Sequence, residues 1–412
     1  MDSAYSTPQE AGRIQQLALI VGVVGLLVLG IGIVVSPFLG LTRHDAIAQF
    51  FRSYLLGYVF WIGITLGCLA ILMLQHMTGG AWGVVSRRVL EAGTRTLLPM
   101  ALLFVPILLG MHSLYHWADE HAVQTDEIIR HKAKYLNIPF FAGRAVIYFV
   151  LWGIWIYFLN RWSQEQDRTA DRRLGRRMAV FSGPGLVIFV LTVTFAAIDW
   201  VMSLDPHWFS TIFGLLFVAG WALSCFAFVI AVLTLLANRQ PLLGVVGPTH
   251  FHDLGKLLLA FVMVWAYFNF SQYLIIWSGN IPEETRWFLY RTKGGWGWVA
   301  IAIVVFHFAL PFLLLLSRDL KRNARRLTII ALVVLLMRLV DLFWLIAPRP
   351  IGETPANSYA QFHLSWMDLV APLGLGGIWL WFFIWQLKKR PLVPFNDPQL
   401  AEAIEFGKHG GH

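Results

Sequence analysis

The sequence predicts an all-α membrane protein, and three observations support this. Hydrophobic residues make up 58% of the 412 residues and charged residues only 13%, against about 25% charged residues in ordinary soluble domains. The apolar residues are grouped into runs of about 20, the length at which an α-helix crosses a ~30 Å hydrocarbon layer. The charged residues lie mostly between these runs. This pattern excludes a soluble enzyme.

Ten apolar runs predict ten transmembrane helices. They cover residues 17–39, 54–75, 97–117, 140–159, 183–204, 212–236, 255–277, 297–316, 327–347 and 367–387. The predicted units are a tail with the first helix, two four-helix bundles, and the tenth helix with a C-terminal tail. These units span residues 1–53, 54–204, 205–347 and 348–412.

The distribution of basic residues predicts the orientation. An even number of spans places both termini on one side, and the connections on that side carry 20 Lys and Arg residues. The opposite connections, with the span ends beside them, carry 10. By the positive-inside rule both termini are cytoplasmic. The polar residues Met1–Gln16 lack the features of a cleavable signal peptide. The net charge of +9 therefore reflects topology, and no nucleic-acid partner is expected.

Several landmarks recur at one offset and predict an internal repeat. Cys68 and Cys225 are 157 residues apart, as are Arg161 and Arg318. Four helices per copy give both copies the same membrane orientation, so helices 2–5 and 6–9 form two parallel-repeat four-helix bundles. Helices 1 and 10 are then peripheral. The alignment places His112 opposite Gln272.

The cysteine content limits the cofactors. The two cysteines lie inside apolar runs, and the sequence has no CxxC or CxxCH motif. Covalently bound haem, iron-sulfur clusters and a disulfide framework are therefore excluded for this chain. A b-type haem needs two facing histidines at similar depth, and His112 and His307 differ in predicted depth. No metal site is predicted.

Five ionisable residues inside the spans are candidates for a proton path or a quinol pocket. A charge at mid-bilayer costs ~2.5–3.5 kcal/mol, so each needs a partner, a wet cavity or a function. The candidates lie mainly in the half of the membrane opposite the termini: His112, Asp199, His307, Arg338 and Asp341. Arg338 and Asp341 share a helix face and can neutralise each other. His307 can be an ordinary interior histidine. Asp199 has no cation on its own helix, so it needs a partner elsewhere or must be protonated.

Five weaker candidates lie at the ends of spans or, for one of them, opposite His112 in the repeat alignment. They are His116, Gln272, Asp368, Asp253 and Lys256. Near the cytoplasmic boundary lie His76, His250, His252, Asp253 and Lys256. Between these residues and His307 the inner half of the membrane offers only hydroxyls such as Thr65, Thr192 and Thr194, so a continuous proton wire is not predicted. The basic clusters 161–177 and 318–326 are interpreted as topogenic and lipid-headgroup contacts.

The candidate residues fit the chemistry of quinol binding. A quinol hydroxyl needs a hydrogen-bond acceptor that can take its proton on oxidation, and the flat ring needs apolar, aromatic walls. An Asp, a His and an Arg brought together in one pocket supply the polar part. The 61 aromatic residues can supply the walls, although they also form interfacial belts.

Two long segments carry a family resemblance. They are Asp199–Thr211, with the sequence DWVMSLDPHWFST, and Phe268–Thr285, which contains FNFSQYLIIW and NIPEET. They resemble the NrfD-like, polysulfide-reductase-type membrane subunits, specifically those of alternative complex III, a quinol:cytochrome c oxidoreductase. The resemblance covers nearly the whole chain. At 412 residues the chain is similar to the shorter of the two such subunits.

The resemblance implies a place in a bacterial inner membrane complex. The implied partners are a homologous longer NrfD-like subunit, a periplasmic iron-sulfur protein and c-type cytochrome subunits, which hold the haems and iron-sulfur clusters, together with lipid. The substrate would be menaquinol or ubiquinol. His112, Asp199 and Arg338 occupy places similar to the family's quinol site. The family also uses an acidic residue near the start of the fourth span, where this chain reads Phe140–Arg144 without a carboxylate.

We therefore expect an integral subunit of a quinol-oxidising electron-transfer complex that acts as scaffold and proton half-channel, and is not catalytic alone. One alternative is a purely structural anchor whose buried charges pair internally. Another is an independent transporter.

Overall fold

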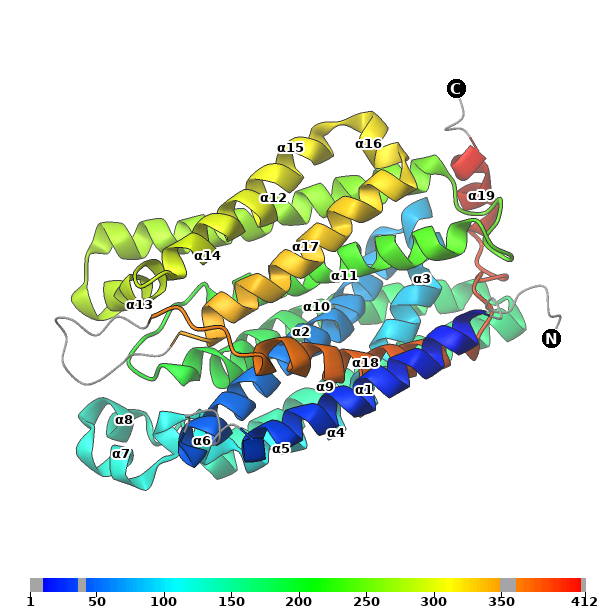
Figure 1. Cartoon of the computed structure of the whole chain (residues 1–412). Coiled ribbons are helices and arrows are strands. Elements are labelled where there is room, and N and C mark those ends of the chain that lie inside the picture. Colours follow the sequence, from blue (N-terminus) through cyan, green and yellow to red (C-terminus); the bar gives the residue numbers. More distant parts are fainter. Residues whose placement is uncertain (1–9, 36–41, 349–360, 409–412) are drawn as a thin grey trace.

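The structure is a computed structural model that describes residues 10–35, 42–348 and 361–408. It is all-α, and its described residues contain no strand. Ten helical segments are long and apolar enough to cross a membrane, which confirms the predicted number. Both ends of the described chain, in α1 and α19, lie at the same end of the molecule (Figure 1), as an even number of spans requires. We call this the terminal end. The membrane side that it faces stays a prediction.

The ten segments run roughly side by side (Figure 1). They are α1 Glu10–Val35, α2 Arg43–Thr78, α3 to α5 Ala81–Leu109, α9 Ile138–Thr169, α10 with η4 Arg172–Leu204, α11 Phe213–Ala237, α12 Pro248–Gly279, α14 to α15 Trp296–Leu316, α17 Ala324–Ile346 and α18 Met367–Lys388. Most are longer than their apolar runs because the helices continue beyond the hydrocarbon. The predicted end of the first span, at residue 39, lies outside the described residues.

Short helices connect the spans. At the end opposite the termini lie η3 His116–Ala118, α7 Glu120–Thr125, α8 Glu127–Lys132, η4 Met202–Leu204 and α13 Pro282–Thr292. At the terminal end lie α16 Arg318–Arg322 and α19 Leu400–Lys408. Side chains cap several helices. Asn137 caps α9, Asp171 caps α10 and Asn323 caps α17, each accepting from a backbone N–H of the first turn.

The third span differs most from its prediction. It begins at Ala81, 16 residues before the predicted start at 97, and is divided into α3 Ala81–Thr94, α4 Leu97–Leu102, α5 Val105–Leu109 and the short α6 Met111–Leu114. The divisions fall near Pro99, Pro106 and Gly110, since proline cannot donate to the helical ladder. The charged residues of α3 lower the hydropathy of this segment, so its sequence does not show where the span begins.

The eighth span contains a change of helix type. α14 Trp296–Ala302 continues into a π-helical segment, η5 Ile303–Ala309, and then into α15 Leu310–Leu316. Such π-helical turns are rare and occur often at functional sites. This one carries His307.

The spans form two sets around a central pair. α2 packs against α3, α10 and α11, and α11 packs against α12 and α17. The central helices approach closely because Gly67 of α2 lies against the backbone of Trp221. There the Sγ atoms of Cys68 and Cys225 are 3.7 Å apart. Contact between residues with a 157-residue offset is what a two-fold relation would produce, while the duplication and the four predicted domain boundaries stay predictions.

The first and tenth spans lie together on the outside, with α18 also packed on α2. Their contact is made by glycines. A Cβ on Gly25 would lie 2.7 Å from the Cα of Gly374, and one on Gly377 would clash with the backbone of Gly22 and Ala18. Helices in a membrane associate by close packing of small residues, because lipid is as apolar as leucine. The peripheral pair is therefore held by backbone proximity.

This contact gives a stability prediction. Gly377→Ala should lower the free energy of unfolding in detergent by about 1–3 kcal/mol, because the added methyl group must push the α1 backbone away. The measurement is thermal unfolding of the purified protein. Gly30→Ala, on the exposed side of α1 with nothing within 4 Å, is the matched control and should be neutral or stabilising. Equal effects of the two substitutions would contradict the glycine contact.

Candidate functional site

Asp199 lies in a closed ion pair near the end of α10. Its carboxylate is 1% exposed. Arg144 of α9 binds it with two parallel bonds, Nε to Oδ2 at 2.8 Å and Nη2 to Oδ1 at 2.9 Å, and the hydroxyl of Tyr148 donates to Oδ2 at 2.8 Å. A bidentate pair with a further donor satisfies the carboxylate. The partner required by the sequence is thus a residue of the neighbouring helix.

The guanidinium of Arg144 is held on its other side as well. Its Nη1 donates to the carbonyl of Tyr135 at 2.9 Å, and its Cζ lies 3.8 Å from the centre of the Tyr135 ring. Burial, and then the negative charge of Asp199, raise the pKa of Tyr135 to about 12, so this phenol stays protonated. The Asp199 carboxylate and the Arg144 guanidinium are therefore held by several bonds, while the Tyr135 hydroxyl has no partner among the described residues.

The second centre lies on α17. Arg338 and Asp341 form an ion pair within their helix, and both side chains are buried. The indole Nε1 of Trp265, on α12, donates to Asp341 Oδ2 at 3.2 Å. The guanidinium contacts Gly220 and lies 5.5 Å from the centre of the Phe217 ring. Asp199 therefore lies on α10, and Asp341 lies on α17.

His307 completes the second centre. It is fully buried, and its ring meets the Trp265 ring edge to face at 4.2 Å. Neither ring nitrogen has a hydrogen-bond partner among the described residues, although the backbone of Val334 faces the ring. Nε and Nη2 of Arg338 are also without a partner in the described chain. Buried polar groups almost always have partners, so these atoms are candidates for contact with water or a ligand.

The five main candidates do not form one pocket. Asp199 belongs to the first centre, whereas Arg338, Asp341 and His307 belong to the second. His112, on α6, is exposed, as is His116 on η3. The expectation that His112, Asp199 and Arg338 share a site is not met by any contact among the described residues.

The weaker candidates have individual environments. Gln272 is buried on α12, two turns from Trp265 on the same face, and its Oε1 has no partner in the described part of the chain. Asp368 accepts from Ser53 Oγ at 2.6 Å and Gln49 Nε2 at 3.0 Å, which ties α18 to α2. Asp253 and Lys256 form a pair near the start of α12, with Lys256 exposed. Only Gln272 resembles the second centre in having an unpaired buried atom.

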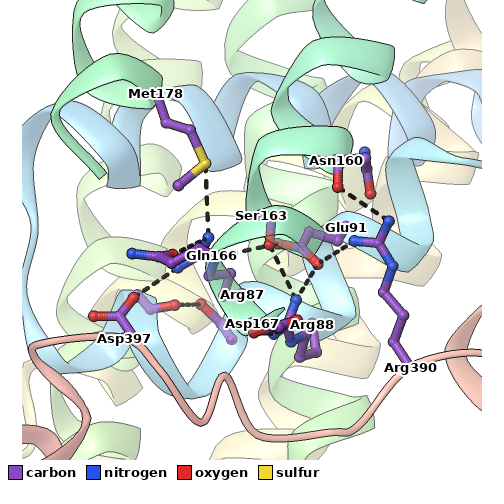
Figure 2. A network of polar contacts seen from close by, with 12 residues as sticks. Arg87, Arg88, Glu91, Asn160, Ser163, Gln166, Asp167, Met178, Arg390 and Asp397 are labelled. Atoms are coloured by element: carbon purple, nitrogen blue, oxygen red, sulfur yellow. Dashed lines mark hydrogen bonds and ion pairs between the residues drawn. The ribbon is translucent and has the colours of Figure 1, made fainter. Parts of the chain in front are cut away.

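A buried polar network at the terminal end was not anticipated as a site (Figure 2). Its centre is Glu91 of α3, fully buried, which accepts from Arg88 Nη1 at 2.8 Å, Arg87 Nε at 3.1 Å and Arg390 Nη1 at 3.2 Å. Ser163 of α9 also donates to it. This network connects the third span, the fourth span and the segment after α18.

The outer members of the network balance its charge. Arg87 Nη1 binds Asp397 Oδ2 at 2.6 Å, and Arg88 Nη2 binds Asp167 Oδ2 at 2.6 Å. The three arginines Arg87, Arg88 and Arg390 thus face the three carboxylates of Glu91, Asp167 and Asp397 (Figure 2). The spacing of Arg87, Arg88 and Glu91 by three and four residues places them on one helix face, which the sequence could have indicated.

The hydroxyls of the inner half are engaged in structural bonds. Thr65 lies 2.7 Å from the Thr96 hydroxyl and accepts from Trp379 Nε1 at 2.8 Å. Thr192 accepts from Trp152 Nε1 at 2.8 Å. The described residues contain no group of three or more His, Cys, Asp or Glu that could hold a metal ion. The unpartnered polar atoms of the second centre are therefore the groups considered for proton transfer or ligand binding.

Removing Asp199 should cost stability. Asp199→Asn leaves the Arg144 guanidinium without its counter-charge, and breaking a buried pair in this way costs about 3–5 kcal/mol. Arg144→Gln combined with Asp199→Asn should recover much of the loss in a thermal unfolding assay. An Asp199→Asn protein of normal stability that has lost activity would instead make Asp199 a functional group.

Glu91→Gln should be more damaging, because three arginines lose their common acceptor charge. We expect a low yield or a thermal transition many degrees lower in detergent. Glu402→Gln, an exposed change on α19, removes the same charge and should leave the transition unchanged. Normal stability of Glu91→Gln would show that the network is not required for folding.

No family model and no curated protein matches this chain. The chemistry of the site therefore rests on its own residues and their geometry.

Proposed function

We propose that the chain is an integral membrane subunit of a quinol-oxidising, cytochrome c-reducing complex, and that its second centre handles protons released from quinol. The observation that carries this proposal is the set of unpartnered polar atoms on His307 and Arg338 beside the Asp341 carboxylate. His307 lies on the π-helical segment η5 inside the eighth span, and Arg338 lies on α17, which packs against that segment. In the first centre, by contrast, the carboxylate is fully hydrogen-bonded.

The chemistry of the second centre suits proton transfer. Quinol oxidation releases two protons and two electrons, and the electrons need cofactors of other subunits. A neutral imidazole has one nitrogen that accepts a proton and one that donates, so His307 can take up a proton on one side and release one on the other. This leaves the ring in its other tautomer, which must be reset before the next proton. The Asp341 carboxylate offsets the positive charge of Arg338 next to it. Trp265 fixes both the carboxylate and the imidazole ring.

The remaining features of the proposal follow the resemblance in the two motif segments. The partners would be the longer homologous subunit, a periplasmic iron-sulfur protein and c-type cytochromes, in a bacterial inner membrane with cytoplasmic termini. The chain itself would add no covalent cofactor. The ten apolar spans support a multi-pass membrane location.

A structural anchor is the second candidate, and the first centre favours it. Asp199 is fully satisfied by Arg144 and Tyr148, and the network around Glu91 is balanced. Fully paired charges hold helices in place and need no proton exchange. The two candidates differ in what the second centre does.

Extraction in a mild detergent tests the proposed partners. The affinity-tagged chain, purified from its own membranes, should co-purify with c-type haem by haem stain and with quinone by extraction. The assembly should reduce cytochrome c with a quinol analogue. Isolation as a haem-free protein from such membranes would contradict membership of this complex.

His307→Phe tests the proton role. The phenyl ring can keep the packing against Trp265 but cannot carry a proton, so turnover should fall by about tenfold or more. Haem content should stay normal. His121→Phe, at an exposed histidine of α7, is the matched control and should be unaffected. Normal turnover in His307→Phe would favour the anchor.

A further inference from the structure

An arginine-lined groove lies between α9 and α10 at the terminal end. Its volume is about 710 Å³. Three arginines, Arg173, Arg176 and Arg177, line it together with the aromatic and aliphatic residues Phe158, Phe181 and Val180. The apolar runs of these helices end at 159 and begin again at 183. The groove therefore crosses the boundary between hydrocarbon and headgroups.

The charged part of the groove has no internal counter-charge. Within the described chain, no carboxylate pairs with the three arginines. Of the two nearest acidic residues in sequence, Asp167 binds Arg88, and Asp171 caps α10 by accepting from the backbone N–H of Arg173. Arg177 is oriented by the Trp162 ring, whose centre is 4.4 Å from its Cζ. Three guanidinium groups thus lie at one end of the groove without an anion.

The apolar part of the groove is built by a specific local sequence. The Trp155 indole stacks on Phe181 at 5.1 Å and donates from Nε1 to the Phe181 carbonyl at 3.1 Å. Gly185 permits this approach, because a Cβ there would clash with Trp155. Pro184 lies in the same helical turn and supplies no N–H to the ladder. The aromatic wall is therefore fixed in position.

We propose that this groove binds an anionic phospholipid, with its phosphate between Arg173, Arg176 and Arg177 and an acyl chain along Phe158, Phe181 and Val180. Guanidinium groups bind phosphate with charge-assisted hydrogen bonds. The apolar wall continues toward the hydrocarbon at Val180, which is 68% exposed. A lipid supplies both the anion and the apolar chain that this geometry matches. This inference is independent of the proposed electron-transfer role.

Delipidated protein in a neutral detergent provides the test. Dioleoylphosphatidylglycerol should raise the thermal transition and remain bound in native mass spectrometry, whereas dioleoylphosphatidylcholine should do so weakly. The triple variant Arg173→Gln, Arg176→Gln and Arg177→Gln should bind the anionic lipid at least tenfold more weakly, since each basic residue contributes several-fold to such binding. The matched control changes Arg13, Arg43 and Arg130 to Gln, an equal loss of charge among exposed arginines outside the groove and outside both basic clusters.

A second pair of variants tests the groove without altering charge. Val180→Trp should block the groove and weaken lipid binding, whereas Val187→Trp, two turns along the same exposed face and outside the groove, should not. Equal lipid binding by the two triple variants would overturn the proposal. So would binding of inorganic phosphate, at the same site, as tightly as the lipid.

Discussion

Charge neutralisation inside an apolar bundle is the constraint on which the rest of this structure depends. A charge in hydrocarbon costs several kcal/mol unless a partner meets it there. In this chain the buried charges pair in three sets of guanidinium and carboxylate groups: one around Glu91, one at Asp199 and one at Asp341. Two of these sets join different segments. Arg144 joins α9 to α10, and Arg87 joins α3 to the C-terminal segment through Asp397. The ion pairs therefore help to decide which helices become neighbours.

The three sets differ in how completely their polar atoms are used, and this difference separates structure from function. At Asp199 both carboxylate oxygens are bonded, Oδ2 by two donors and Oδ1 by one, and the partner guanidinium makes three hydrogen bonds. At Asp341 the neighbouring His307 and part of Arg338 have none in the described chain. The helix that carries His307 is π-helical at that point, which widens the turn. The unpartnered atoms of His307 and Arg338 lie beside a carboxylate inside a span, and this is what supports the proposed proton role of the second set.

Helix packing without ions depends on small residues and on aromatic rings. Glycines bring α1 against α18 and α2 against α11, where no hydrophobic driving force distinguishes helix from lipid. Tryptophan rings fill the centre and donate to carbonyl or hydroxyl oxygens, as Trp152 does to Thr192 and Trp155 to Phe181. Where this packing ends, between α9 and α10, arginines and an aromatic wall remain uncovered. The same rules that build the bundle thus leave a surface suited to an anionic lipid.

The sequence by itself determined the all-α class, the ten spans, the shared side of the termini and the Arg338–Asp341 pair, because hydropathy, span parity and helical spacing are local properties. It misplaced the start of the third span, since Arg87, Arg88 and Glu91 read as a loop when their partners are unknown. Only the tertiary structure decided that Arg144 binds Asp199, that Arg390 binds Glu91 and Asp397 binds Arg87, and that His112 is exposed without a contact to either centre. Each of these depends on which faces of distant helices meet, and that is fixed by the packing of the whole bundle.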